Sequence, residues 1–392
     1  MTFDFDEPVD RRGTGALKWD EAGDALPMWV ADMDFRTAPA IREALRRRLD
    51  HGVFGYSVVP DAWADAYAGW WRERHGLDID PSWLTFCTGV VPAISSIVRK
   101  LTTPAENVVI MTPVYNIFFN SILNNGRNVL QAPLAYRDGA YEIDWVALER
   151  ALADPQTSLM ILCNPHNPTG RIWDRATLAR IGELCWEHHV VVVSDEIHCD
   201  LTDPGHEYVP FASAGEHCRM NSVTCLAPTK TFNMAGLQTA AVMTPDPTLR
   251  HRVWRGLNTD EVAEPNAFAV DAAIAAFTQG AGWLDGLRGY LAGNKRVVRE
   301  AIDGYNATAP ADRRLTLTAS DATYLLWIDC SAISDDTDEL CDHLLADQRL
   351  MLSPGAQFGG DGRLFVRMNV ATQRDRVREG VRRLLDGVRS YR

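Results

Sequence analysis

The stretch Ser222-Val-Thr-Cys-Leu-Ala-Pro-Thr-Lys-Thr-Phe-Asn-Met-Ala-Gly-Leu-Gln238 joins a strand-like run to a turn that carries one lysine, Lys230. Residues 222–226 are rich in β-forming side chains, so we predict a strand there. In an open α/β sheet, ligands gather at the carboxyl ends of the strands. A lysine that is desolvated in such a place can lose its proton and attack a carbonyl group. Because a solvated surface lysine would also fit this short pattern, the assignment depends on the rest of the chain.

The chain on both sides of this stretch alternates between strand-like and helix-like runs. Strand-like runs occupy residues 107–112, 128–132, 158–163, 190–194, 222–226 and 239–243. Helix-like runs fall at 91–101, 115–124 and 174–189, and two long ones follow at 265–279 and 283–305. This alternation predicts an α/β fold in which helices cover both faces of a mostly parallel sheet.

A length of 392 residues is more than a single hydrophobic core usually serves, so we expect two domains. We assign residues 1–50 to an N-terminal arm and part of a small domain, and residues 51–280 to the large domain. Residues 281–392 form a smaller α+β C-terminal domain, with strand-like runs at 314–318, 323–329 and 364–370.

Composition excludes several classes of partner. The net charge of −13 argues against binding to nucleic acid or to an anionic membrane, and no apolar run is long enough to span a bilayer. The acidic N-terminus lacks the pattern of a secretory signal, so we expect a cytoplasmic protein. The eight cysteines include no C-x-x-C pair, which is typical of reduced, buried thiols. Cys185, His188 and His189 lie close in sequence but lack a second pair of ligands, so we expect no metal.

A glycine followed by a helix start is the first motif that carries chemistry. In Thr88-Gly-Val-Val-Pro-Ala-Ile94, Gly89 permits a tight turn and Pro92 suits the beginning of a helix. The free N–H groups at such a start can bind phosphate, although the same pattern is often purely structural.

Two further motifs follow predicted strands. In Cys163-Asn-Pro-His-Asn-Pro-Thr-Gly170, two Asn-Pro pairs form a rigid turn that fixes Asn167, whose amide could bind a phenolic oxygen. In Val190-Val-Val-Val-Ser-Asp-Glu-Ile-His198, the strand leads directly into Asp195. A carboxylate there could keep a ring nitrogen protonated. Alternatively, the first motif is only a tight connection, and Asp195 in the second has only a structural role.

An arginine interrupts an apolar strand in the C-terminal part of the chain, Phe365-Val-Arg-Met-Asn-Val370. A buried guanidinium without a partner would be costly, so Arg367 needs a carboxylate. That carboxylate belongs either to an internal Asp or Glu or to a bound substrate.

Taken together, these motifs resemble those of the fold-type I pyridoxal phosphate (PLP) enzymes, in the aminotransferase class I/II superfamily. The residues that match in order are Gly89, Tyr115, Asn167, Asp195, Lys230 and Arg367. The resemblance is closest to the MalY/PatB group of cystathionine β-lyases, through the stretches Leu26-Pro-Met-Trp-Val-Ala-Asp-Met-Asp-Phe35, Gly89-Val-Val-Pro-Ala-Ile94, Asp195-Glu-Ile-His198 and Ala227-Pro-Thr-Lys-Thr-Phe-Asn-Met-Ala-Gly-Leu-Gln238. The fold it implies has a seven-stranded-type sheet in the large domain.

The resemblance implies PLP as cofactor and gives roles to particular residues. Lys230 would carry the cofactor and move the Cα proton, Asp195 would pair with the pyridine nitrogen, and Asn167 with O3′. Tyr115 would stack on the ring and border the substrate. The remaining cofactor contacts would be Gly89, Val90, Val91 and Thr229 near the phosphate, and His198 near O3′.

The resemblance also implies a small amino acid as substrate and a homodimer with shared sites. Arg367 would bind the substrate carboxylate, and Tyr56 would reach the phosphate of the neighbouring subunit. The implied reaction is α,β-elimination of L-cystathionine or another S-substituted cysteine, giving a thiol, pyruvate and ammonia.

Two positions depart from the wider superfamily and match the lyase group. Gln238 stands where many members have an arginine, and His198 stands where many have a tyrosine. Neither residue acts on the bond that breaks, so an aminotransferase remains the first alternative. A protein that acts mainly by binding a regulator is the second.

Overall fold

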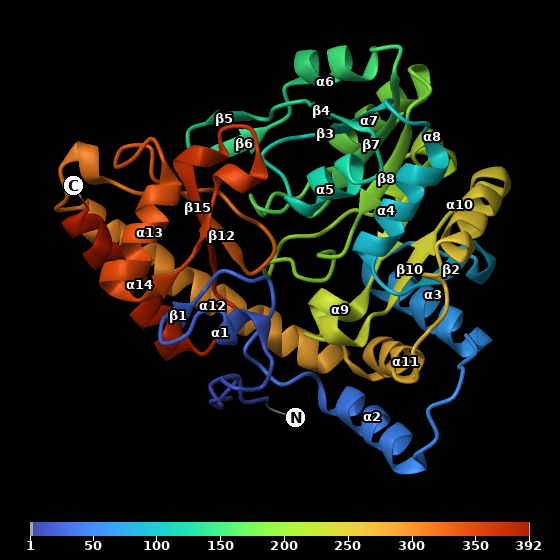
Figure 1. Cartoon of the computed structure of the whole chain (residues 1–392), viewed down its shortest axis with the longest axis horizontal. Helices are drawn as coiled ribbons and strands as arrows, with labels where there is room; N and C mark the ends of the chain where they lie inside the picture. Colours follow the sequence, from blue (N-terminus) through green and yellow to red (C-terminus); the bar gives the residue numbers. More distant parts are fainter. Residues whose placement is uncertain (1–2, 392) are drawn as a thin grey trace.

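A computed structural model describes residues 3–391. Its centre is a seven-stranded sheet in the order β2-β10-β9-β8-β7-β3-β4 (Figure 1). All neighbouring strands are parallel except that β10 runs antiparallel to both β2 and β9. The strands are β2 (Leu84–Cys87), β3 (Asn107–Ile110), β4 (Asn128–Gln131), β7 (Thr157–Cys163), β8 (Val191–Asp195), β9 (Ser222–Leu226) and β10 (Ala240–Met243). The mostly parallel sheet predicted from the alternating pattern is therefore confirmed.

Helices cover both faces of this sheet because successive side chains of each strand point to opposite faces. Val108 and Ile110 of β3 pack in one core with helices α4, α5 and α10, whereas Val109 packs in another with α6 and α7. The bounds are α4 (Val90–Leu101), α5 (Ile117–Leu123), α6 (Trp145–Leu152), α7 (Arg175–Glu187), α8 (Glu216–Met220) and α10 (Pro247–Thr259). The strands buried on both faces read as the continuous apolar runs typical of parallel sheets.

A second, four-stranded antiparallel sheet lies in the C-terminal part, in the order β11-β12-β15-β14. The long helix α12 (Ala281–Asn306) runs between the two parts of the molecule, and α13 and α14 cover the smaller sheet (Figure 1). The remaining bounds are β11 (Thr316–Leu317), β12 (Leu325–Asp329), α13 (Thr337–Gln348), β13 (Leu350–Met351), β14 (Ser353–Pro354), β15 (Phe365–Asn369) and α14 (Arg374–Ser390).

The N-terminal segment is divided between the two parts. Strand β1 (Leu26–Pro27) pairs in parallel with β13, near the far end of the chain. Helix α2 (Pro39–His51) instead packs against α11 (Ala269–Gln279), which also contacts α3 (Asp61–His75). A short helix α1 (Leu17–Asp20) precedes β1, and a two-stranded ribbon of β5 (Ala135–Arg137) and β6 (Ala140–Glu142) lies beside the main sheet.

The sequence did not predict every element. Strand β2, which closes the edge of the main sheet, has only four residues and no regular alternation, and α10 was not predicted either. The helix predicted from residue 265 begins at Ala269 instead, because residues 265–268 form a turn in which Asn266 Oδ1 accepts from the Phe268 and Ala269 N–H groups.

No helix within residues 3–391 is both long and apolar enough to cross a membrane. All eight cysteines are free and buried, as predicted.

Candidate functional site

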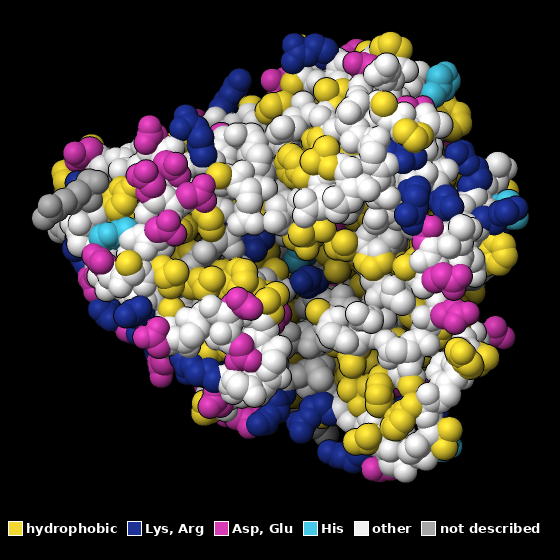
Figure 2. Space-filling model, in the orientation of Figure 1, with side chains coloured by type: hydrophobic (Ala, Val, Ile, Leu, Met, Phe, Trp, Pro, Cys, Tyr) yellow, Lys and Arg dark blue, Asp and Glu magenta, His cyan; other side chains and the backbone are white. Residues whose placement is uncertain are grey.

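A cavity of about 250 Å³ lies at the carboxyl ends of the central strands. Figure 2 shows the molecular surface hollowed between the two parts of the molecule. The structure brings together nine of the residues predicted for the site, and each of them lines this cavity: Gly89, Val90, Val91, Tyr115, Asn167, Asp195, His198, Thr229 and Lys230. Residues far apart in sequence meet here because parallel strands end at the same edge.

Lys230 lies in α9 (Pro228–Thr231), a single turn that follows β9 directly. Its Nζ donates a hydrogen bond to the carbonyl oxygen of Ala31 at 2.6 Å. Burial lowers the pKa of Lys230 to about 8, against the charge of Asp32, which raises it. A lysine with this pKa is partly neutral near neutral pH, and a neutral amine is both a nucleophile and a base.

Asp195 ends β8, opposite Cys163 in the neighbouring strand. Burial raises its pKa to about 7, while the N–H of Ile197, which donates to Oδ1 at 3.1 Å, lowers it. No ion pair reaches this carboxylate from any residue between 3 and 391. The side chain is therefore free to pair with a cationic N–H group in the cavity, and such a partner would favour its ionised form.

The start of α4 also lines the cavity. Gly89 precedes the helix in an extended conformation, and no side chain caps the helix. The first N–H groups of a helix have no partner within it, and those of Val90 and Val91 lie in this first turn. A Cβ atom on Gly89 would lie 3.2 Å from Cδ of Pro92, so glycine keeps the turn close. This end of the cavity suits an anion such as phosphate.

Arg367 lies in β15 and reaches the site from the smaller sheet. Its Nη1 donates to Oδ1 of Asn167 at 3.1 Å and its Nη2 to the carbonyl oxygen of Trp29 at 3.0 Å. Its Nε has no partner within the described residues, and its Cζ lies 4.8 Å from the ring centre of Phe358. Burial lowers the pKa of Arg367 to about 10. No Asp or Glu side chain in the described chain pairs with it.

His198 is buried at the edge of the cavity, and its Nδ1 has no hydrogen-bond partner among residues 3–391. Burial lowers its pKa to about 3, with help from the charges of Lys230 and Arg367, so the imidazole is neutral. Its ring lies edge-on to Tyr324 at 6.3 Å. The pKa of Tyr115 is raised by burial, so that phenol is also neutral at physiological pH.

A backbone segment near the N-terminus borders the site, and its Ala31 lines the cavity. The segment 29–35 contributes the Trp29 and Ala31 carbonyls that hold Arg367 and Lys230. The hydroxyl of Tyr324 donates to the same Ala31 oxygen at 3.0 Å. The contacts of Trp29 and Ala31 were missed because both act through carbonyl groups, which carry no side-chain signal.

Asn233 holds this segment against α9, the turn that carries Lys230 and that we call the lysine turn. Its Oδ1 accepts from the N–H of Met33, and its Nδ2 donates to the carbonyl oxygens of Met33 and Phe35 at 2.9 and 2.7 Å. Asn233 adopts a φ of 52°, a left-handed conformation that asparagine tolerates better than most residues. The sequence signal that could have pointed to Asn233 as a site residue is its position three residues after Lys230.

Tyr56 does not lie in the cavity. It is fully exposed, in an irregular segment between α2 and α3 that also exposes Val53, Phe54 and Val58. Hydrophobic side chains gather around α2 and α11 on the face shown at the lower right of Figure 2. The single chain therefore leaves Tyr56 without any contact to its own site.

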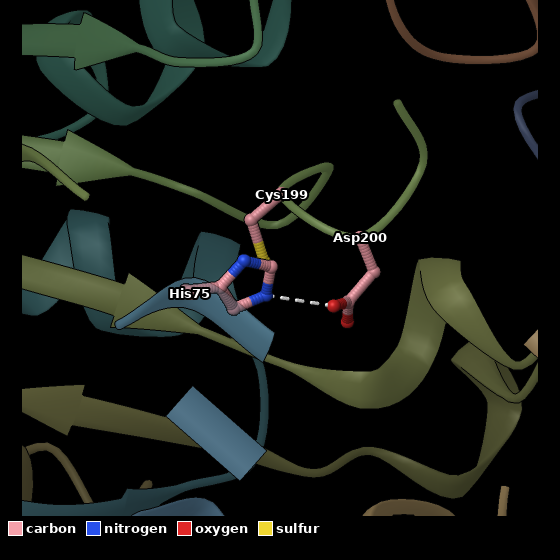
Figure 3. A group of neighbouring side chains, drawn as sticks. All are labelled: His75, Cys199 and Asp200. Carbon is pink, nitrogen blue, oxygen red and sulfur yellow. Dashed lines mark hydrogen bonds and ion pairs between the residues drawn. The ribbon is translucent and has the colours of Figure 1, made fainter. Parts of the chain in front are cut away.

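One group of metal-ligating side chains occurs within the described residues, and it is not the Cys185 segment. His75, Cys199 and Asp200 place their ligand atoms within 4.8 Å of one another (Figure 3).

The chain matches known proteins over most of its length. The family model described as aminotransferase class I and II matches residues 26–384. The chain is 44% identical to cystathionine beta-lyase PatB of Bacillus subtilis (strain 168), over 97% of this chain and 99% of that protein. It is 35% identical to protein MalY of Escherichia coli (strain K12) over the full length of both.

Among solved structures, cystalysin from Treponema denticola, described as containing a pyridoxal 5′-phosphate cofactor, superposes with a TM-score of 0.95. It has 30% sequence identity and full coverage of both chains. The predicted resemblance and the predicted fold are confirmed by these matches. The chain belongs to the aminotransferase class I and II family.

Proposed function

We propose that this protein is a PLP-dependent carbon-sulfur lyase that catalyses α,β-elimination of L-cystathionine and related S-substituted cysteines. The products are a thiol, which is homocysteine from cystathionine, together with pyruvate and ammonia. The observation that carries the proposal is that Lys230, with its lowered pKa, shares one cavity with Asp195 and lies beside an Arg367 that lacks an acidic partner. The relatives named above for their lyase activity or PLP content match nearly the whole chain.

The donors around the cavity fit PLP. The start of α4, with Thr229, would hold the phosphate, and Asp195 would pair with the protonated ring nitrogen. Asn167 would bind the phenolic oxygen O3′, with the neutral His198 beside it. When bound, PLP supplies an electron sink that weakens the Cα–H bond of the attached amino acid.

The chain's own residues then orient the substrate and move the proton. The buried guanidinium of Arg367 binds the α-carboxylate through two parallel hydrogen bonds, which fixes the position of Cα. The neutral Nζ of Lys230 accepts the proton from Cα. The electron pair left at Cα forms the Cα–Cβ double bond as the thiolate leaves Cβ with the electrons of the C–S bond. Hydrolysis of the resulting aminoacrylate gives pyruvate and ammonia.

Tyr115 and Thr229 line the same cavity and complete the cofactor contacts. The phenol of Tyr115 lies edge-on to Phe118 at 5.6 Å, so packing from α5 fixes its orientation. Because its pKa is raised, Tyr115 acts here as a neutral ring that stacks on the cofactor and borders the substrate.

The proposal is tested by adding L-cystathionine to the purified protein while absorbance, pyruvate and free thiol are followed together. Equal release of pyruvate and thiol without any added oxo acid is the expected result, and Lys230→Ala should abolish both this release and the lysine-bound absorbance. Conversion of the cofactor to its pyridoxamine form without pyruvate would instead identify an aminotransferase. Full lyase activity in Lys230→Ala would contradict the assignment of Lys230.

The functional unit in this proposal is a homodimer in which Tyr56 of each subunit reaches the phosphate site of the other. The complete exposure of Tyr56, within a segment of exposed apolar residues, supports this arrangement. Light scattering that gives the mass of one chain at micromolar concentration would contradict it. The cytoplasmic location stays a prediction, which cell fractionation would test.

A further inference from the structure

A buried carboxylate supports the lysine turn from behind. Oδ2 of Asp200 accepts a hydrogen bond from the hydroxyl of Thr231, the residue that follows Lys230, at 2.9 Å. Asp200 and Thr231 are both almost completely buried. This contact lies behind the turn, because Asp200 and Thr231 do not line the cavity that contains Lys230.

The other oxygen of Asp200 is anchored to α3. Oδ1 accepts from Nε1 of Trp70 at 2.9 Å and lies 2.8 Å from Nε2 of His75 (Figure 3). The pKa of Asp200 is lowered: burial alone would raise it, but the bonds from His75, Trp70 and Thr231 outweigh burial. The carboxylate is therefore ionised and is held by three donors on two different elements.

Hydrogen bonding explains the group of His75, Cys199 and Asp200 better than a bound metal ion does. Both oxygens of Asp200 are already engaged, and Nε2 of His75 is used in the bond to Asp200. The hydrogen bonds fix the lysine turn rather than leave open positions for a metal.

The turn needs such support because it is very short. Helix α9 has four residues, and an isolated helix of that length has no stability of its own. Within the turn, the N–H groups of Phe232 and Met234 bond to the carbonyls of Pro228 and Thr229. Thr231 makes the side-chain hydrogen bond that ties the turn to the buried interior behind it.

We propose that Asp200 is a positioning residue for the reaction. Acting through Thr231, it sets the distance of the Lys230 amine from the carbon that gives up its proton. Trp70 keeps Oδ1 of Asp200 in place, and the additional bond from His75 contributes to stability. The inference rests on the proposed function, because it requires Lys230 to be the group that binds the cofactor and accepts the proton.

Three variants separate positioning from stability. Thr231→Val keeps the shape of the side chain and removes the donor, Thr231→Ser restores the donor, and His75→Phe removes a different hydrogen bond from the same carboxylate while keeping a ring beside Trp71 and Tyr208. For each variant we would measure kcat, KM, melting temperature, and the rate at which apoenzyme takes up PLP as lysine-bound absorbance.

A displacement of Lys230 by a fraction of an ångström should lower kcat of Thr231→Val by about 10- to 100-fold. KM should change by less than about twofold because Arg367 is untouched, and PLP uptake should slow in parallel with kcat. Thr231→Ser should recover kcat to within about threefold of wild type. His75→Phe should lower the melting temperature about as much as Thr231→Val but keep kcat within about twofold of wild type.

Unchanged kcat and PLP uptake in Thr231→Val, with a normal wild-type spectrum, would overturn the role of Asp200 and leave the proposed function intact. An equal loss of kcat in His75→Phe and Thr231→Val would also overturn it, because the network would then act only through stability. A wild-type protein without lysine-bound absorbance would overturn the assignment of Lys230 itself, and both proposals with it.

Discussion

Asn167 and Arg367 are 200 positions apart in the chain, yet Nη1 of Arg367 donates to Oδ1 of Asn167 at 3.1 Å. Asn167 follows a strand of the main sheet, whereas Arg367 lies in the smaller sheet. The proposed O3′ ligand and the proposed carboxylate ligand therefore touch before any substrate arrives. A change in the position of the smaller sheet would move both groups.

Replacing Arg367 by lysine should weaken substrate binding more than it slows the chemical step. Lysine keeps the positive charge but lacks the planar fork that binds a carboxylate through two bonds. We expect kcat/KM to fall about 100-fold, equivalent to about 2.7 kcal/mol, mainly through a higher KM. Initial rates of pyruvate release over a range of cystathionine concentrations measure this effect. The exposed Arg363, replaced by lysine, is the matched control, and a similar loss there would contradict the prediction.

The lowered pKa of Lys230 predicts how the apoenzyme captures PLP at different pH values. Burial disfavours the charged amine, so Lys230 loses its proton as pH rises through about 8, well below the value for an ordinary lysine. Since only the neutral amine attacks the aldehyde, the rate of capture should rise through the same pH range. Stopped-flow absorbance between pH 6 and about 10 measures the midpoint. A midpoint near that of a solvated lysine would show that the amine is not desolvated.

Removing the amide of Asn233 should loosen the segment 29–35 from the lysine turn. Asn233→Ala loses three hydrogen bonds to backbone groups and places alanine at a φ of 52°. We expect a loss of about 3 kcal/mol in the free energy of unfolding, measured by urea denaturation. Asn233→Gly loses the same bonds without the conformational strain, so it should be about 1 kcal/mol more stable than Asn233→Ala. Equal stability of the two variants would mean that the left-handed conformation costs nothing here.

Hybrid dimers can test whether Tyr56 acts across an interface. Coexpression of Lys230→Ala with Tyr56→Ala chains would produce hybrids in which one site has both wild-type residues, provided that Tyr56 serves the neighbouring subunit. If half of the dimers are hybrids, with one of two sites intact, about one quarter of wild-type activity should return. Each variant expressed alone is the control. No recovery in a mixture with verified hybrids would place Tyr56 outside the partner's site.

Most of the main sheet was predictable because its central strands are buried on both faces and therefore read as continuous apolar runs. Strand 222–226 was predicted with the bounds that the structure shows, and 158–163 differs from β7 by one residue at its start. Strand β2 was not predicted, although it is no shorter than β4, which lies at the other edge of the sheet.

The cavity residues were predicted for a related reason. Their positions follow strand ends or a helix start, and such positions can be read along the sequence. The sequence left two possible partners for Arg367; no Asp or Glu side chain within the described residues pairs with it, which supports the proposal of a bound carboxylate. Carbonyl groups of Trp29 and Ala31 could not be found in the same way, because backbone atoms are identical at every residue. The sequence gives no indication that Asp200 contacts Thr231, because this hydrogen bond depends on the folded structure.

The segment 29–35 also bears on the order in which the protein can mature during synthesis. Nδ2 of Asn369 donates to the carbonyl oxygen of Asp32 at 2.7 Å, across 337 positions of the chain, and strand β1 pairs with β13. The segment 29–35 thus finds these partners only after β15 has been synthesised, when a very large loop is closed. Nascent chains that end before β15 would have Lys230 but no fixed wall beside it, and they would have no Arg367. The cavity is therefore complete only in chains that contain both the segment 29–35 and strand β15.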